Sequence, residues 1–143
     1  MQKNKIVFLI RAYNEATRII SVIEDILSRG FDQILVVDDG SLDDTKELLH
    51  RYFGEKIIYI HHLINRGGGA ALETGFVYIR RYAHDHDWEF IVTFDADGQH
   101  DITDMDSFLE MFASHPKTQV VYGSRFIVKT RSNVPLLRKI ILW

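Results

Sequence analysis

Short apolar runs rich in β-branched residues recur along the chain, and each is followed by a segment with helical periodicity. The runs have the length of strands and are almost continuously hydrophobic, which is typical of strands covered on both faces. Strands and helices that alternate at this spacing predict a largely parallel, doubly wound α/β sheet. The expected strands are Ile6–Ile10, Gln33–Val37, Lys56–His61, Glu89–Phe94 and Gln119–Tyr122, and the expected helices are Ala16–Arg29, Leu42–Phe53, Gly67–His84 and Ile102–Ser114.

The bulk composition favours one globular domain over residues 1–143. With 46% hydrophobic and 26% charged residues, a chain of this length can bury a single core. Its net charge of −3 offers no electrostatic case for a nucleic-acid partner, and it has no cysteine for disulfide or thiolate chemistry. The apolar residues 140–143 break off without a helix stop signal, so we expect the N-terminal part of a longer protein.

In a doubly wound sheet the ligand lies outside the carboxyl ends of the strands. All the unusual segments of this sequence follow an expected strand. These segments are Arg11–Glu15, Asp38–Ser41, Asn65–Ala70, Asp95–His100 and Gly123–Arg125. The sequence therefore predicts a functional site at this edge of the sheet.

The acidic segment after the fourth expected strand is a candidate metal site. If the chain stays extended there, Asp95, Asp97 and Gln99 point to the same side, because residues two apart share a face. Hard oxygen ligands in small number suit Mg²⁺ or Mn²⁺, which would neutralise charge on a departing diphosphate. A surface turn with a helix cap is the alternative, and the residues alone leave both open.

The pair Asp38-Asp39 ends the second expected strand. Ser41 with Asp44 three residues later predicts a capping box for the next helix, and Gly40 supplies a tight turn. These roles do not explain two adjacent carboxylates at the end of a buried strand. We expect Asp39 to accept a hydrogen bond from a base or ribose, and Asp38 to be structural.

A glycine-rich segment, Asn65–Ala70, leads into the third expected helix. Amide groups and the helix dipole favour an anion at such a position. The segment lacks the Lys-Ser/Thr ending of a P-loop and does not follow the first strand. Close helix–sheet packing is therefore the preferred reading for the small residues 67–71 and for Gly75.

One aromatic residue and two histidine-containing runs complete the candidates. Tyr13 is expected either to stack on a base or to lie in the core. The runs His84–Asp87 and His61-His62 have no partners at ligand spacing, so we expect solvated side chains rather than metal sites.

Together these segments resemble the family 2 glycosyltransferases of GT-A fold, especially the branch that includes dolichyl-phosphate mannose synthase-like enzymes acting on polyprenyl phosphates. The resemblance runs from Ile6 to about Arg138. Its carriers are Ala-Tyr-Asn-Glu at 12–15, Val-Asp-Asp-Gly-Ser at 37–41, Asn-Arg-Gly-Gly-Gly-Ala-Ala-Leu at 65–72, Asp-Ala-Asp-Gly-Gln-His at 95–100 and Gly-Ser-Arg-Phe at 123–126.

The resemblance implies an inverting transfer from a UDP- or GDP-linked sugar, assisted by Mg²⁺ or Mn²⁺. Residues that match donor-binding positions are Ala12, Tyr13, Glu15, Val37, Asp39, Asp95, Ala96, Arg125 and Arg138. Asp95, Asp97 and Gln99 match metal ligands, and Asp97 and Arg125 match catalytic positions. The implied acceptor is a polyprenyl phosphate or a glycan. The implied location is the cytoplasm, with the full-length protein at or anchored to the membrane surface.

Three departures from the family pattern bear on these expectations. Arg11 stands where the family usually has proline, and Gly68 replaces a common lysine. No residue matches the carboxylate that serves many members as general base. An acceptor that is already an anionic phosphate would need no base. Gln99 and the amphipathic segment 134–143 favour such a lipid acceptor.

Three other functions remain open on the residues alone. A nucleotide-sugar-binding module without turnover would carry the same donor residues. A sugar nucleotidyltransferase also needs carboxylates and a metal, but the early Gly-rich loop with Arg or Lys that we expect for it is missing after the first strand. A structural calcium site would leave Tyr13, Asp39 and Arg125 unexplained.

Overall fold

The computed structural model describes residues 2–124. The chain forms two compact units, with the boundary after Thr103, and each unit is described by itself. The first unit contains a sheet of β1 (Ile6–Ala12), β2 (Ile34–Asp38), β3 (Ile58–His61) and β4 (Phe90–Asp95), the helices α1 (Ile19–Ser28), α2 (Thr45–Tyr52) and α3 (Gly68–His86), and two 3-10 turns, Lys3–Lys5 and Gly54–Lys56. All strand pairs are parallel, in the order β3-β2-β1-β4. In the second unit the described helix is α4 (Asp104–Ser114).

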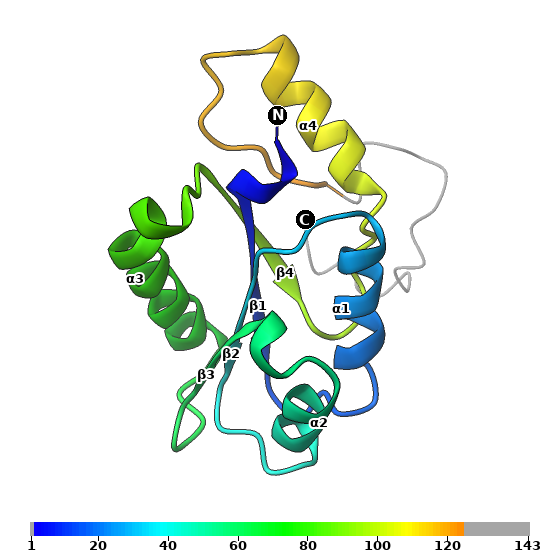
Figure 1. The fold of residues 1–143 in the computed structure, drawn as a ribbon, viewed down its shortest axis with the longest axis vertical. Helices are drawn as coiled ribbons and strands as arrows, with labels where there is room; N and C mark the ends of the chain where they lie inside the picture. Colours follow the sequence, from blue (N-terminus) through cyan, green and yellow to red (C-terminus); the bar gives the residue numbers. More distant parts are fainter. Residues whose placement is uncertain (1, 125–143) are drawn as a thin grey trace, which may run out of the picture. The chain divides into compact units, whose positions relative to one another are not determined.

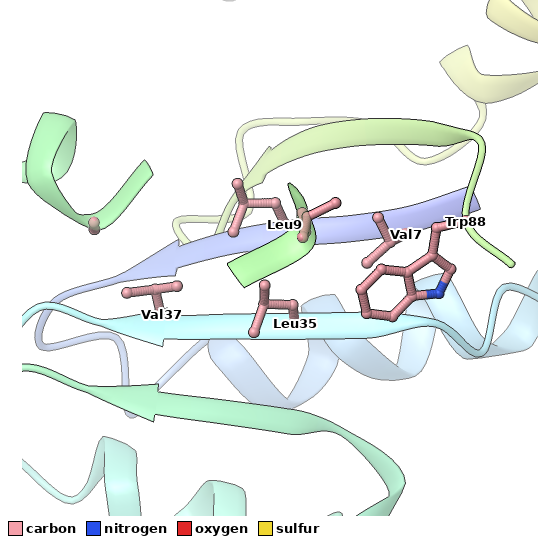
Figure 2. Close-up of a cluster of buried hydrophobic side chains, with 7 residues drawn as sticks. Val7, Leu9, Leu35, Val37 and Trp88 are labelled. Atoms are coloured by element: carbon pink, nitrogen blue, oxygen red, sulfur yellow. The ribbon is translucent and has the colours of Figure 1, made fainter. Parts of the chain in front are cut away.

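The sheet lies between two helical layers, with α3 on one face and α1 and α2 on the other (Figure 1). Figure 2 shows Val7 and Leu9 of β1 beside Leu35 and Val37 of β2 on one side of the sheet, near Trp88. The α3 residues Ala71 and Ile79 complete this buried cluster. The expected doubly wound α/β architecture is therefore confirmed.

Gly75 explains how α3 approaches the sheet so closely. A Cβ atom at this position would lie 2.2 Å from Cδ1 of Leu9, far inside van der Waals contact. The packing role expected for this glycine is thus confirmed, as it is for the fully buried Ala71. Packing does not explain Gly67 and Gly69, whose Cβ atoms would meet no atom within 4 Å.

Two details differ from the sequence predictions. Residues 115–124 contain no strand, so the expected strand at Gln119–Tyr122 is wrong, and Val120 and Tyr122 are 60% and 86% exposed. Helices α1 and α2 each begin three residues later than expected. The first three residues of each expected helix instead belong to loops, and these loops are joined by hydrogen bonds, as described below.

Candidate functional site

Residues from four loops and strand ends enclose one hollow of about 230 Å³ at the carboxyl edge of the sheet. It lies where the strand order reverses between β1 and β4, the position at which doubly wound sheets bind ligands. Its lining residues are Arg11, Ala12, Tyr13, Glu15, Asp39, Asn65, Gly68, Ala71, Asp95, Ala96 and Asp97. Most of the residues predicted from the strand ends are therefore brought together.

Two predicted residues lie away from the hollow, and two others fall outside the described residues. Val37 is fully buried in the core cluster beneath the edge. Gln99 lies in the turn after β4 and is not among the residues that line the hollow. Arg125 and Arg138 lie outside the described residues, as does the amphipathic segment 134–143.

The loop after β1 is held by the loop after β2. Asn14 adopts a left-handed φ of 55°, its N–H donates to Oγ of Ser41 (2.9 Å), and its Oδ1 accepts from the N–H of Leu42 (2.8 Å). The N–H of Glu15 donates to Oγ1 of Thr45 (3.0 Å). These hydrogen bonds tie the two loops together beside Tyr13 and Glu15, which line the hollow.

Asp38 is fully buried and has the structural role expected for it. Its carboxylate accepts hydrogen bonds from the N–H (2.9 Å) and hydroxyl (2.6 Å) of Ser41 and from the hydroxyl of Tyr59 (2.7 Å). The predicted capping box is wrong, because Ser41 bonds Asp38 and α2 begins only at Thr45. Burial, followed by the hydrogen bond to Asp38, raises the pKa of Tyr59 far above its ordinary value.

Asp39 is 2% exposed and forms the end of a buried hydrogen-bonded chain. Its Oδ1 contacts Nδ1 of His62 (2.6 Å) and accepts from the N–H of Arg66 (3.0 Å). The second ring nitrogen of His62 lies 2.9 Å from Oγ1 of Thr74 on α3. His62 is only 8% exposed, so the expectation of a solvated histidine at this position is wrong.

The environment of Asp39 keeps its carboxylate ionised. Burial works to raise its pKa, but hydrogen bonds from His62 and from the N–H groups of Arg66 and Gly67 outweigh burial. The pKa of Asp39 therefore lies below its ordinary value of 3.8. A fixed negative acceptor thus lines the hollow at neutral pH.

Acid should consequently destabilise the fold through Asp39. A depressed folded-state pKa contributes stability that is present above the unfolded pKa and is lost as the pH falls through the folded value. We expect the free energy of unfolding, measured by urea titration, to fall below about pH 4, and to fall less steeply in Asp39→Asn. Asp85→Asn, at an exposed position of α3, is the matched control and should keep the parent slope. Equal slopes in the parent and Asp39→Asn would contradict this assignment.

Asp95 is paired with Arg11 across the β1–β4 ladder, where the two residues are in register. Nε and Nη2 of Arg11 donate to the two carboxylate oxygens of Asp95, at 2.5 Å and 3.0 Å. The hydrogen bond to Asp95 raises the pKa of the Arg11 guanidinium, against the opposing effect of burial. A permanent positive charge thus lies among the acidic groups of the hollow.

The chain turns directly after β4, so the extended path expected for the acidic segment is wrong. Ala96 and Asp97 form a turn, Gly98 has a φ of +72°, and Oδ1 of Asp97 accepts the N–H of Gln99 at 2.9 Å. A surface turn at this position was the alternative that the sequence left open beside the metal site. Asp95 and Asp97 nevertheless line the same hollow.

The carboxylate oxygens at this turn are suitable ligands for a divalent cation. Within residues 2–124, no three His, Cys, Asp or Glu side chains form a metal-binding group. Two carboxylates in one hollow still suit Mg²⁺ or Mn²⁺, since these ions complete their shells with water and substrate phosphates. Asp95 and Asp97 would hold such an ion together with a bound phosphate group. Arg11 would compete with the ion for Asp95, because its guanidinium hydrogen-bonds both carboxylate oxygens.

Two further surface features lie outside this site. A larger hollow of about 350 Å³ runs along α3 and is lined mainly by apolar groups such as Phe76 and Val77. It contains none of the side chains at the strand ends, so we do not assign the ligand to it. The run His84–Asp87 is an exposed helix end, as predicted.

A doubly wound parallel sheet with polar groups gathered at its switch point is the architecture of nucleotide-binding α/β proteins. Residues 7–141 match the family model for glycosyl transferase family 2, and the chain belongs to this family.

The chain is similar to curated proteins in sequence and to one solved structure in fold. An uncharacterized protein of Methanocaldococcus jannaschii is 34% identical over 98% of the chain and 55% of its own length. A UDP-N-acetylglucosamine–dolichyl-phosphate N-acetylglucosaminyltransferase of Methanococcus voltae is 33% identical over 96% of the chain and 59% of its own length. Glucosyl-3-phosphoglycerate synthase of Mycobacterium tuberculosis, solved with UDP, superposes on 75% of the chain and 39% of its own, with a TM-score of 0.50 and 21% identity. The chain thus has a GT-A-type fold and spans little more than half of the two sequence relatives.

Sequence reasoning missed the roles of two residues in this site. His62 was expected to be solvated because the sequence shows no partner for it at ligand spacing, whereas its partner Asp39 lies 23 positions away. Arg11 was noted only as a departure from a pattern. Its place at the end of a strand, like that of Asp95, was the signal that could have identified it.

Proposed function

We propose that the whole protein is an inverting glycosyltransferase and that the hollow between β1 and β4 is its donor site. The carrying observation is the convergence of Tyr13, Asp39 and the pair Asp95 and Asp97 on one hollow at the switch point. Tyr13, 41% exposed, offers a ring on which a base could stack, and Asp39 offers an ionised acceptor. We propose a UDP-linked sugar as donor, because the names of one relative and of the solved neighbour both include UDP.

We propose a polyprenyl phosphate as acceptor. Two relatives are named for dolichyl phosphate: the Methanococcus voltae enzyme and a dolichyl-phosphate beta-glucosyltransferase of Trichomonas vaginalis, which is 29% identical over 90% of the chain and 42% of its own length. The acceptor's phosphate oxygen would attack the anomeric carbon as the bond to the diphosphate breaks, and UDP would leave with the electron pair. This nucleophile is already anionic, so it needs no general base. A divalent cation, when bound, supplies neutralisation of the departing diphosphate.

A lipid acceptor would require the whole protein to work at a membrane surface. Among residues 2–124, no helix is both long and apolar enough to cross a bilayer.

Calorimetry on the chain tests the donor proposal. We expect heat on titration with UDP-N-acetylglucosamine that increases when Mn²⁺ is present, and weaker or no heat with GDP-mannose. N-acetylglucosamine 1-phosphate is the control ligand, since it lacks the base and ribose that Tyr13 and Asp39 would contact. No binding of either nucleotide sugar to folded protein would overturn the donor assignment.

Turnover separates this function from its two competitors. Because the chain spans 55–59% of two relatives, a donor-binding module without turnover is the second candidate. Transfer of labelled sugar to dolichyl phosphate would exclude it. Release of pyrophosphate from UTP and a sugar 1-phosphate would instead indicate a nucleotidyltransferase.

A further inference from the structure

Arg11 and Gly68, the two residues that the sequence resemblance singled out as unusual, lie next to each other. A Cβ atom on Gly68 would lie 2.5 Å from Nη1 and 3.4 Å from Cζ of Arg11. The guanidinium therefore occupies the space that a side chain at position 68 would need. The glycine allows Arg11 to lie over the start of α3, and from there it reaches Asp95.

Arg11 already provides Asp95 with the positive charge that a cation would bring. Its planar fork bonds both carboxylate oxygens, which is the geometry that makes arginine a strong carboxylate partner. A divalent ion that approached Asp95 would have to displace this fork and would be repelled by its charge. The ion pair is partly exposed, with 41% of the Arg11 side chain and 29% of the Asp95 side chain accessible, so it can be opened.

We propose that Arg11 is a specificity-determining residue that makes cation binding at this site depend on the donor. Without a donor, the guanidinium keeps Asp95 and the site binds divalent cations weakly. When a nucleoside diphosphate enters, its phosphates offer Arg11 another bidentate anionic partner, and Asp95 becomes available to a cation. This inference rests on the proposed donor site, although its cation-binding part can be measured without any donor.

Mn²⁺ binding in the absence of nucleotide is the first test, read from the electron paramagnetic resonance signal of free Mn²⁺. Removing the competing charge in Arg11→Met should tighten Mn²⁺ binding by about tenfold. Arg81→Met, at an exposed position of α3, removes the same charge away from the hollow and should change the affinity by less than about twofold. Unchanged or weaker Mn²⁺ binding by folded Arg11→Met would overturn the proposal.

A second pair of variants tests the geometry while leaving the charge in place. In Gly68→Ala the three atoms nearest to the new methyl group all belong to the flexible Arg11 side chain, so the guanidinium has to shift, which should weaken its contact with Asp95 without a large loss of stability. We expect Mn²⁺ binding to tighten in Gly68→Ala, though less than in Arg11→Met. Gly69→Ala is the matched control, because its Cβ meets nothing within 4 Å, and it should behave as the parent. These variants decide the question if Arg11→Met does not fold, and identical affinities of the pair would reject the proposal.

Donor titrations then separate this inference from the proposed function. In the parent, UDP should tighten Mn²⁺ binding, whereas in Arg11→Met the Mn²⁺ affinity should depend less on UDP. If UDP binds neither protein but Arg11→Met gains Mn²⁺ affinity, the donor assignment fails and the competition for Asp95 stands. If UDP binds the parent and the Mn²⁺ affinities are equal, the donor site stands and the role given to Arg11 fails.

Discussion

Gly40→Ala is expected to lower the free energy of unfolding by about 2–5 kcal/mol. Gly40 has a φ of +76°, which residues with a side chain adopt only at a cost. Its Cβ would also lie 2.6 Å from the carbonyl carbon of Ile64 and 2.8 Å from the nitrogen of Asn65. Both contacts are with backbone, so no side-chain rotation can relieve them, and the loop after β3 would have to move.

Gly40→Ala should also disturb the candidate site. The loop after β3 carries the N–H of Arg66, which donates to Asp39, and Asn65, which lines the hollow. A displaced loop would loosen the acceptor that we assign to the donor. We therefore expect Gly40→Ala to weaken binding of UDP-N-acetylglucosamine as well as stability.

Urea unfolding followed by circular dichroism measures the stability change. Gly69→Ala is the control, since it adds the same methyl group at a helical position where nothing lies within 4 Å. We expect Gly69→Ala to be neutral or to stabilise by up to about 1 kcal/mol. A loss below about 1 kcal/mol in Gly40→Ala would show that the loop after β3 yields easily.

The fold and the position of the site follow from local sequence patterns. β1 and β2 are buried almost throughout, because helices cover both faces, and such strands appear in a sequence as continuous apolar runs. Parallel strands end at one edge, so the segments that follow them were expected to meet there. The failed strand at Gln119–Tyr122 shows the limit of this reasoning. A short apolar run indicates an extended chain. It becomes a strand only if it pairs with the backbone N–H and C=O groups of a neighbouring strand.

The partners of individual side chains could not be predicted in the same way. Ser41 and Asp44 satisfy the pattern of a capping box, but Ser41 instead bonds Asp38 and Asn14. The pair Arg11 and Asp95 is 84 positions apart, and it forms because β4 adds beside β1 rather than beside β3. No local pattern of the sequence encodes that strand order.

Asp97→Ala is expected to abolish the contribution of Mn²⁺ to donor binding, which would weaken UDP-N-acetylglucosamine by about a hundredfold, or ~2.7 kcal/mol, when Mn²⁺ is present. Asp95 and Asp97 line the same hollow, so removal of Asp97 would leave a cation with one carboxylate of the pair. Without Mn²⁺ the variant should bind the donor as the parent does, or slightly more tightly, because a negative charge near the diphosphate has been removed.

The design of this experiment separates loss of the cation from loss of the turn. Oδ1 of Asp97 accepts the N–H of Gln99, so Asp97→Asn, which keeps an acceptor oxygen, is measured beside Asp97→Ala. Both variants should lose the response to Mn²⁺, since the neutral amide is a poor ligand for this hard cation compared with a carboxylate. Asp85→Ala on the exposed side of α3 controls for the change of net charge and should keep the full response. If Asp97→Ala binds the donor with Mn²⁺ as tightly as the parent does, Asp97 does not hold the cation, and its assignment as a metal ligand fails.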